Sequence, residues 1–395
     1  MKKVLFISWD GPQTSYMEGL FFPIFSEIQK QSDYEFHVLQ FTWAEKEKLD
    51  KIKSAAEQNN IKYVSSKIHR KPVASLGSMF TVFNAPKIIN QFIRQHGIDV
   101  LMPRSTFPAM MINRLSNKGV KVIFDADGLA IDERVDFSGL SKKSLMYKIL
   151  KSAETKLLNN SDAVITRSQK AIDIHVNTIG EKNRSKFSVV SNGRNIEHFK
   201  FNSLKRAEIR KELGVEANAK LWVYCGSLGP QYGWDEMMEI FSLYHKNNSN
   251  SRFLILTGNI EFAKNHINED LKDLCTIKSV AFSEVPNYLS ASDLAFALRQ
   301  PTYSMQGVAP IKLGEYLLMG LPSIASKGIG DSEDILRQIP GNFIFDHSDK
   351  NAISKAVEFA ENLEVDKESL RQAGIKYFSI EESAKSYVKV LNELQ

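Results

Sequence analysis

The chain has 395 residues, of which 43% are hydrophobic and 25% are charged, and its formal net charge is +5. These proportions are typical of a globular protein long enough for two domains, and they exclude a disordered chain or a coiled coil. The two cysteines, Cys225 and Cys275, form no C-x-x-C pair. This argues against a disulfide framework or a zinc site and favours a reducing compartment. The small net charge does not require a nucleic-acid partner, and no basic-aromatic array suggests one.

The N-terminus starts with Met1-Lys2-Lys3 and continues with a short apolar run over residues 4–7. The run stops at Ser8, too soon for the apolar region of a secretory signal, so it predicts a first buried strand. No apolar stretch approaches the span of a bilayer. We therefore expect a cytoplasmic protein, soluble or bound peripherally at the inner face of the membrane.

Short apolar runs alternate with longer helical patterns, for example over 17–31 and 86–96. This alternation predicts parallel sheets with right-handed crossovers. The expected strands are too many for one ordinary sheet, so the sequence predicts an α/β fold of two Rossmann-like domains facing each other across a cleft. The strands are expected at residues 4–7, 36–41, 100–102, 120–124, 163–166, 187–190, 221–225, 253–256, 279–282, 294–298, 323–325 and 343–345.

The domain boundary is expected at the turn Ser191-Asn192-Gly193, which follows a predicted strand. The N-terminal domain would span residues 1–192, and the C-terminal domain residues 193–380. A polar segment over 194–215 is suited to a linker and a first helix. An amphipathic helix over 381–395 is expected to pack back onto the N-terminal domain.

The most informative stretch follows the expected strand at 294–298. A loop over 300–309 leads to Pro310, which favours a helix start. The free N–H groups and positive dipole of a helix N-terminus suit a diphosphate, and Lys312 adds a full charge. Glu315 could accept hydrogen bonds from ribose hydroxyls. On spacing alone, an ordinary helix with a solvated Lys312 and Glu315 explains the pattern as well.

The string from Ala309 to Ile324, APIKLGEYLLMGLPSI, closely resembles the P-x-K-x-x-E-Y-x-x-x-G-x-P signature of retaining glycosyltransferases with the GT-B fold. The nearest group is family four, the glycosyl transferases group 1. Other segments occur in the order that this family requires. They are residues 189–193 with Phe199, residues 224–228 with Gly233, and residues 282–286 with Asp293.

The resemblance implies retaining transfer of a sugar from a nucleotide-diphosphate sugar, held by the C-terminal domain, to a glycan or lipid-linked acceptor. It implies that Lys312 and the helix N-terminus stabilise the diphosphate leaving group and that Glu315 holds the ribose. No metal and no other cofactor is expected. Cell-surface polysaccharide assembly is a setting that suits such an enzyme. The expected donor-binding residues are Gly226, Ser227, Phe282, Arg299, Gly307, Pro310, Ile311, Lys312 and Glu315.

The chain departs from the family pattern at three positions. Gly307 stands where many members carry a second glutamate that contacts the donor sugar. Ser227 and Tyr232 stand where many members carry an arginine and a lysine for the diphosphate. We therefore expect Lys312 and Arg299, aided by backbone amides, to supply the positive charge.

In the N-terminal half, Asp125-Ala126-Asp127-Gly128 follows an expected strand. An Asp-x-Asp pair could hold a divalent cation, as in the GT-A fold, but a parallel two-domain layout disfavours this reading. In the GT-B interpretation, Asp127 lies near the donor sugar as a catalytic candidate. The alternative is a turn in which Asp127 caps the next segment.

Two further residues are candidates for the acceptor site. Gly11 follows the first strand, and Arg104 follows the strand expected at 100–102. An ordinary turn and a surface arginine are the competing explanations.

Two basic stretches, 67–71 and 142–156, stand beside or among apolar residues. They could contact an anionic membrane, or their lysines could simply lie in water above a buried apolar face.

Two alternative functions remain open: a sugar-nucleotide epimerase of the same fold and a non-catalytic nucleotide-sugar-binding relative. No phosphate-loop or G-x-S-x-G motif occurs, and the eight histidines show no ligand spacing.

Overall fold

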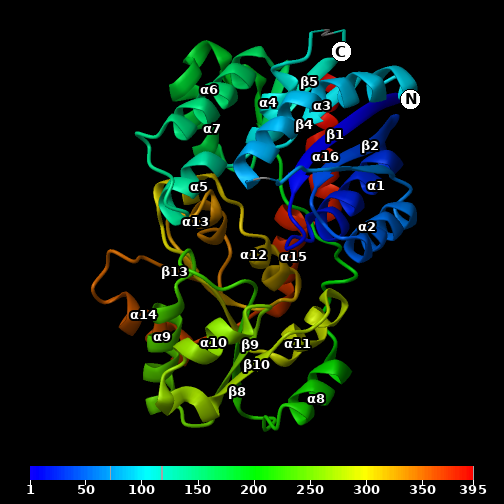
Figure 1. The fold of residues 1–395 in the computed structure, drawn as a ribbon. Helices are drawn as coiled ribbons and strands as arrows, with labels where there is room; N and C mark the ends of the chain where they lie inside the picture. The colour runs from blue at the N-terminus through cyan, green and yellow to red at the C-terminus, as the bar shows by residue number, and fades with distance from the viewer. Residues whose placement is uncertain (72, 117–118, 395) are drawn as a thin grey trace. The chain divides into compact units, whose positions relative to one another are not determined.

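The computed structural model describes residues 1–71, 73–116 and 119–394. The chain forms two compact units (Figure 1). The N-terminal unit comprises Met1–Gly193, Gln306–Val308 and Ile380–Gln395, and the C-terminal unit comprises Arg194–Met305 and Ala309–Ser379. The boundary at Gly193 lies one residue from the predicted one. The sequence had placed Gln306–Val308 in the C-terminal domain instead.

The N-terminal unit contains a seven-stranded parallel sheet in the order β3-β2-β1-β4-β5-β6-β7. Its central strands are buried on both faces, as their continuous apolar runs predict. The strands are β1 (Lys2–Asp10), β2 (Tyr34–Thr42), β3 (Lys62–Lys67), β4 (Val100–Pro103), β5 (Lys121–Asp127), β6 (Ala163–Thr166) and β7 (Phe187–Val189).

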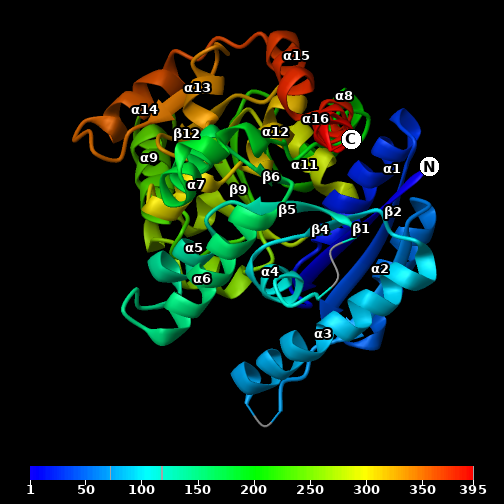
Figure 2. The same cartoon turned by 90° about the horizontal axis from the view of Figure 1, so that it is seen from above.

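Helices pack on both faces of this sheet, as Figure 2 shows. The C-terminal helix α16 (Ile380–Glu393) packs against α1. The Tyr34 hydroxyl donates to the Leu391 carbonyl at 2.8 Å, which fixes the end of this helix. The other helices are η1 (Met17–Phe21), α1 (Phe22–Gln31), α2 (Lys46–Gln58), α3 (Ala74–His96), α4 (Thr106–Ile112), α5 (Ala130–Phe137), α6 (Leu145–Asn160), α7 (Gln169–Ile179) and η2 (Glu181–Lys186).

The C-terminal unit contains a six-stranded parallel sheet in the order β10-β9-β8-β11-β12-β13. Its strands are β8 (Lys220–Cys225), β9 (Ser251–Leu256), β10 (Cys275–Lys278), β11 (Leu294–Ala297), β12 (Ser323–Ser326) and β13 (Phe343–Phe345). Its helices are α8 (Ser203–Glu212), α9 (Trp234–Asn247), α10 (Ile260–His266), η3 (Glu269–Leu274), η4 (Phe282–Glu284), α11 (Val285–Ala291), η5 (Tyr303–Gly307), α12 (Ile311–Leu318), α13 (Ser332–Leu336), α14 (Ala352–Glu361) and α15 (Lys367–Phe378).

Each sheet has one point where the direction of winding reverses. In the N-terminal unit it lies between β1 and β4, and in the C-terminal unit between β8 and β11. Two connections leave such a point in opposite directions, so the loops part there and leave room beyond the carboxyl ends of the strands. The residues that follow these four strands are therefore the ones to inspect for a site.

Two strand predictions were wrong, both at sheet edges. The edge strand β3 (Lys62–Lys67) was not predicted, because it is mostly exposed and its residues are largely polar. The strand expected at 279–282 lies earlier, at β10 (Cys275–Lys278), and Phe282 begins the turn η4. An edge strand lacks the continuous apolar run of a central strand, so its sequence carries a weaker signal.

No helix in the described part of the chain is both long and apolar enough to cross a membrane.

Candidate functional site

The helix α12 presents Lys312 at the carboxyl end of the C-terminal sheet. Pro310 occupies the N-cap position in an extended conformation, and the helix starts at Ile311, one residue later than predicted. Leu313, Tyr316 and other apolar side chains of α12 are buried in the core. Their burial fixes the rotation of the helix, and the first backbone N–H groups stay free of intrahelical bonds.

The Lys312 ammonium lies in an aromatic and backbone pocket. It donates to the Tyr224 hydroxyl at 2.8 Å and lies 4.1 Å and 4.6 Å from the ring centroids of Tyr224 and Tyr232. The Tyr224 hydroxyl donates in turn to the Ser227 carbonyl. Gly226 leaves room for the ammonium, because an added Cβ would lie 2.6 Å from Lys312 Nζ. The φ of Gly226 is +146°, a conformation that also favours glycine.

Arg299 supplies a second positive charge next to β11. Its guanidinium lies 4.9 Å from the ring centroid of Tyr232 and donates to Gln231 Oε1 at 3.2 Å. Arg299 Nε is buried without a hydrogen-bond partner in the described part of the chain. We call Arg299 and Lys312 the C-terminal cation pair. Neither member forms an ion pair with a carboxylate of a described residue.

The cation pair carries positive charge that the protein does not neutralise. Burial, and secondarily the charge of Arg299, lowers the pKa of Lys312 to about 7. An anion at this point would restore the charged form of Lys312, because a nearby opposite charge raises the pKa of a lysine. Burial, with a smaller contribution from Glu315, raises the pKa of the neighbouring Cys225 thiol to about 12, so this cysteine is not an activated nucleophile.

Glu315 is buried and not solvated, so the ordinary-helix alternative is wrong for this residue. Its Oε1 accepts a hydrogen bond from Arg194 Nε at 2.8 Å. Phe282 lies beside them: its ring centroid is 5.8 Å from the Arg194 guanidinium and 4.9 Å from the His198 ring, which it stacks on. Arg194 thus contacts both Glu315 and Phe282, and their shared role in donor binding stays a prediction. The sequence analysis missed Arg194, whose one signal was its place directly after the Asn192-Gly193 turn.

The structure assigns Gly307 to the N-terminal unit, whereas the sequence analysis grouped it with the donor-binding residues of the C-terminal domain. An added Cβ at Gly307 would lie 2.8 Å from the Leu129 backbone nitrogen and 3.0 Å from Gly128 Cα. Ser168 Oγ also donates to the Gln306 carbonyl at 2.6 Å, which holds this segment in place. The absence of a glutamate at position 307 therefore has a steric cause, since the backbone at Gly128 and Leu129 leaves no room for a side chain.

Four charged residues meet beyond the carboxyl ends of β4, β5 and β6 in the N-terminal unit. We call Arg104, Asp125, Asp127 and Arg167 the N-terminal charge cluster. The fully buried Asp125 carboxylate accepts from Arg104 Nη1 at 3.0 Å and from Arg167 Nη2 at 3.1 Å and 2.8 Å. Arg104 is buried, so the competing explanation, an arginine on the surface, was wrong.

Asp127 is the partly exposed member of the N-terminal charge cluster. Its Oδ1 lies 2.7 Å from Arg104 Nη2, and its backbone N–H donates to Asp125 Oδ1 at 3.0 Å. Its φ is +65°, which aspartate tolerates better than most residues. Leu129, not Asp127, is the N-cap of α5, so the capping alternative was wrong.

The electrostatics of the N-terminal charge cluster disfavour the Asp-x-Asp metal interpretation. Two guanidinium groups already surround Asp125, and both also pair with Asp127, Arg104 at 2.7 Å and Arg167 at 3.7 Å. A divalent cation would have to approach against two positive charges. Among the described residues, no group of three histidine, cysteine or acidic side chains is arranged to hold a metal ion.

The predicted acceptor residue Gly11 has a clear packing role. An added Cβ would lie 2.6 Å from a ring atom of Trp43 and 2.5 Å from Gln13 Oε1. Asp10, at the end of β1, lies close to Gln40, whose Nε2 donates to it at 3.4 Å, and burial raises the pKa of Asp10. The acceptor roles of Gly11 and Arg104 stay predictions.

The sequence analysis also missed Arg167 and the contacts of the Tyr224 and Tyr232 rings with Lys312. Arg167 follows β6 directly, so its position after a predicted strand was the available signal. Tyr232 marked a departure from the family pattern, yet only the structure reveals that its ring contacts both members of the C-terminal cation pair.

Solved structures with a similar fold cover nearly the whole chain. HepE of Anabaena in complex with UDP-glucose has a TM-score of 0.73 at 15% identity, with 100% of both chains covered. Sucrose-phosphate synthase of Thermosynechococcus elongatus has a TM-score of 0.72 at 13% identity, covering 100% of this chain and 99% of that one. UDP-GlcNAc 2-epimerase of Neisseria meningitidis, bound to UDP-GlcNAc, has a TM-score of 0.61 at 13% identity, covering 99% and 100%.

At the level of sequence, no curated protein matches the chain. The family model described as "Glycosyl transferases group 1" matches residues 205–377, which lie in the C-terminal unit except for Gln306–Val308 and include the C-terminal cation pair. The two parallel sheets with their helices have the α/β architecture of the GT-B glycosyltransferases, and the family match in the C-terminal unit supports a relationship to glycosyl transferases group 1.

Proposed function

We propose that the chain is a glycosyltransferase that moves a sugar from a nucleotide-diphosphate sugar to a glycan or lipid-linked acceptor, with retention and without a metal ion. The proposal places the reaction in cell-surface polysaccharide assembly at the cytoplasmic side of the membrane. The observation that carries it is the C-terminal cation pair, two positive charges without a carboxylate partner among the described residues. They flank the switch point between β8 and β11, where α/β sheets bind ligands. The group 1 family match and a neighbour solved with UDP-glucose support the same interpretation.

In this proposal the cation pair stabilises the diphosphate as it leaves the sugar. Negative charge develops on the leaving phosphate in the transition state, so a fixed cation there lowers the barrier. Tyr224 and Tyr232 hold Lys312 in place, so little reorganisation is needed when the anion arrives. Gly226 allows a phosphate to approach the backbone, and the N-terminus of α12 adds its dipole.

The nucleoside would lie beside Glu315 and Phe282. Arg194 orients the Glu315 carboxylate by a hydrogen bond to Oε1, and the second oxygen can accept from a ribose hydroxyl. Phe282, 48% exposed, offers an aromatic face to the base. Asp127 as a contact of the donor sugar and Gly11 and Arg104 as contacts of the acceptor stay part of the proposal.

Calorimetric titration with UDP, GDP and ADP tests the donor site directly. We expect one of these nucleotides to bind the wild type and to bind Lys312→Met and Arg299→Gln more weakly. Lys246→Met, on an exposed face of α9, is the matched control and should bind like the wild type. If none of the three nucleotides binds, the donor site is wrong. If Glu315→Gln binds with unchanged affinity, the assignment of the ribose contact is wrong.

A sugar-nucleotide epimerase is the second candidate, supported by the fold similarity to UDP-GlcNAc 2-epimerase. The two functions differ in what happens to a donor without an acceptor. A transferase hydrolyses it slowly and releases free sugar, whereas an epimerase returns an isomeric nucleotide sugar. A panel of nucleotide sugars analysed by chromatography therefore separates them, and binding without any conversion would support a non-catalytic relative.

A further inference from the structure

The first halves of α3 and α6 expose an unusual number of large apolar side chains. On α3 these are Leu76, Phe80 and Phe83, which are 51–61% exposed. On α6, Leu145 is 73% exposed, and Met146 and Ile149 are also exposed. We call these six residues the apolar face. The sequence allowed α6 to bury its whole apolar side, but only Leu150, Leu157 and Leu158 of its large apolar residues are buried. Contiguous exposed apolar surface marks an interaction site.

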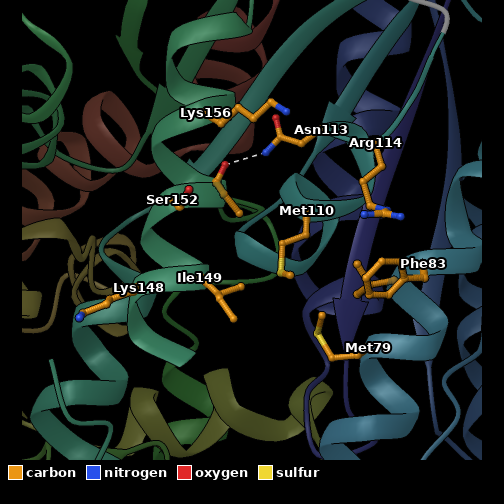
Figure 3. Close-up of a pocket in the computed structure, with 11 residues that line it drawn as sticks. Met79, Phe83, Met110, Asn113, Arg114, Lys148, Ile149, Ser152 and Lys156 are labelled. Atoms are coloured by element: carbon orange, nitrogen blue, oxygen red, sulfur yellow. Dashed lines mark hydrogen bonds between the residues drawn. The ribbon is translucent and has the colours of Figure 1, made fainter. Parts of the chain in front are cut away.

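A groove lies between α3, α4 and α6 and has a volume of about 380 Å³. Figure 3 shows Met79, Met110 and Ile149 pointing toward one another across this groove. The Arg114 guanidinium lies 3.9 Å from the ring centroid of Phe83 at one side. A hydrogen bond from Asn113 Nδ2 to the Ala153 carbonyl at 2.7 Å joins the end of α4 to α6. The floor is therefore apolar, and the helices that form it are tied together.

A second hollow of about 370 Å³ lies at the start of α3. It is lined by His69, Lys71, Leu76, Gly77 and Phe80. Figure 2 shows the first turns of α3 projecting away from the sheet of the N-terminal unit. Apolar and basic side chains thus recur together along the same helix.

Lysines that have no acidic partner among the described residues lie around the apolar face. Residues 67–96, which include all of α3, contain no aspartate or glutamate. Lys143, Lys148 and Lys156 border α6 or lie on it, and none forms an ion pair with an acidic residue in the described part of the chain. Lys151 differs, because Asp132 and Glu154 neutralise it at 2.9 Å and 2.8 Å. The groove is therefore bordered by lysines, Lys148 and Lys156, that pair with no carboxylate of a described residue.

We propose that the apolar face and its lysines bind the surface of an anionic phospholipid bilayer. Such a surface satisfies both features at once, because acyl chains accept the apolar side chains while phosphate groups meet the lysines. A second copy of the chain would bring one basic face against another, which like charges oppose. The proposal goes beyond the proposed function and does not depend on it. The bilayer contact involves no residue of the N-terminal charge cluster or of the C-terminal cation pair.

Vesicle sedimentation with the full chain tests the proposal. One vesicle preparation contains phosphatidylcholine alone, and the other contains equal parts of phosphatidylcholine and phosphatidylglycerol. We expect the protein to sediment with the anionic vesicles and to stay in solution with the neutral ones. Added salt should weaken the binding, because it screens the lysine charges.

Two variants separate the apolar and the charged contributions. The combined variant Phe80→Ser, Phe83→Ser and Leu145→Ser should weaken binding at least about tenfold, through loss of buried apolar area. The combined variant Lys143→Gln, Lys148→Gln and Lys156→Gln should weaken it by on the order of a hundredfold. Because all six side chains are surface groups, we expect the thermal melting curves and nucleotide binding of both variants to match the wild type.

Matched controls come from the C-terminal unit. Leu204, 80% exposed on α8, is changed to serine, and the exposed Lys211, Lys246 and Lys350 are changed to glutamine. These controls should bind anionic vesicles like the wild type. Equal losses in the controls and the test variants would overturn the proposal, as would equal binding to both vesicle types. A dimer in sedimentation velocity that disappears in the Phe80 variant, without vesicle binding, would instead assign the face to a second copy. Nucleotide titration of the same preparations reports on the donor site separately.

Discussion

The carboxyl ends of the two sheets carry opposite electrostatic designs. In the N-terminal charge cluster, Asp125 and Asp127 balance Arg104 and Arg167. In the C-terminal cation pair, Lys312 and Arg299 are balanced by no carboxylate of a described residue and contact Tyr232 instead. The carboxyl ends of the strands thus carry a neutralised network in one unit and a net positive charge in the other.

This difference indicates a structural role for the N-terminal charge cluster and a ligand-binding role for the C-terminal cation pair. A buried network whose charges cancel stabilises the conformation of the loops that provide it. A buried cation without a partner instead costs stability, and an anionic ligand compensates for it. The comparison therefore predicts that removing charge should have opposite effects on stability in the two units.

The largest effect is expected for Asp125→Ala. This change leaves the buried Arg104 and Arg167 guanidinium groups without their shared partner, which typically costs about 3–5 kcal/mol. Urea unfolding should show the loss. The control Asp349→Ala removes a partly exposed carboxylate that pairs with Lys355 and should change much less. An unfolding midpoint equal to that of the wild type would show that the cluster does not stabilise the N-terminal unit.

A steric prediction concerns Gly307→Glu, which restores the residue common in the family. Its Cβ would meet the backbone at Gly128 and Leu129, so we expect a destabilisation of about 1–3 kcal/mol. Gly258→Ala is the control, because nothing lies within 4 Å of an added Cβ there. A stable Gly307→Glu variant with higher nucleotide-sugar affinity would overturn the steric explanation.

For the C-terminal cation pair, Lys312→Met should act in the opposite direction to Asp125→Ala. Nucleotide affinity should fall by about 2 kcal/mol, since a charge-assisted hydrogen bond is lost. The midpoint of thermal unfolding without nucleotide should stay equal or rise, because methionine fills the pocket without a desolvated charge. A lower melting temperature would mean that the ammonium stabilises the unit, which contradicts the comparison.

The pKa of Lys312, lowered to about 7 by burial and then by Arg299, predicts a pH dependence. An anion binds the protonated form, so nucleotide affinity should fall above pH 7, by up to about tenfold per pH unit. The stability of the nucleotide-free protein changes with pH in the opposite direction to the nucleotide affinity. The unfolded chain, in which the pKa is near 10.5, binds more protons between pH 7 and 10.5, so stability rises across this window. Lys312→Met should remove the pH dependence of both the affinity and the stability. A wild-type nucleotide affinity that does not change with pH would exclude Lys312 as the phosphate contact.

The smallest effect is expected for Phe282→Ala. Loss of an exposed aromatic face should weaken nucleotide binding by about 1 kcal/mol and leave stability almost unchanged. Tyr303→Ala removes a similarly exposed ring, 47% against 48%, and serves as the control. Equal affinities of both variants would remove the base contact from the proposal.

The sequence by itself was sufficient for the α/β class and for most central strands. Buried parallel strands need continuous apolar runs, and these are visible without a structure. It was also sufficient to place Lys312 at the start of a helix after a strand, since Pro310 and the loop before it signal that start. The edge strands β3 and β10 were missed or misplaced because half-exposed strands carry no such run.

Only the tertiary structure decided what each charge contacts. Arg104, Asp125 and Arg167 are far apart in the chain, and their pairing depends on the order of β4, β5 and β6 in the sheet. Likewise, Lys312 and Tyr232 meet only because β8 and β11 are neighbours there. A sequence lists the charged groups near strand ends, but neutralisation depends on distances of a few ångströms, and those distances are set by the packing of strands and helices.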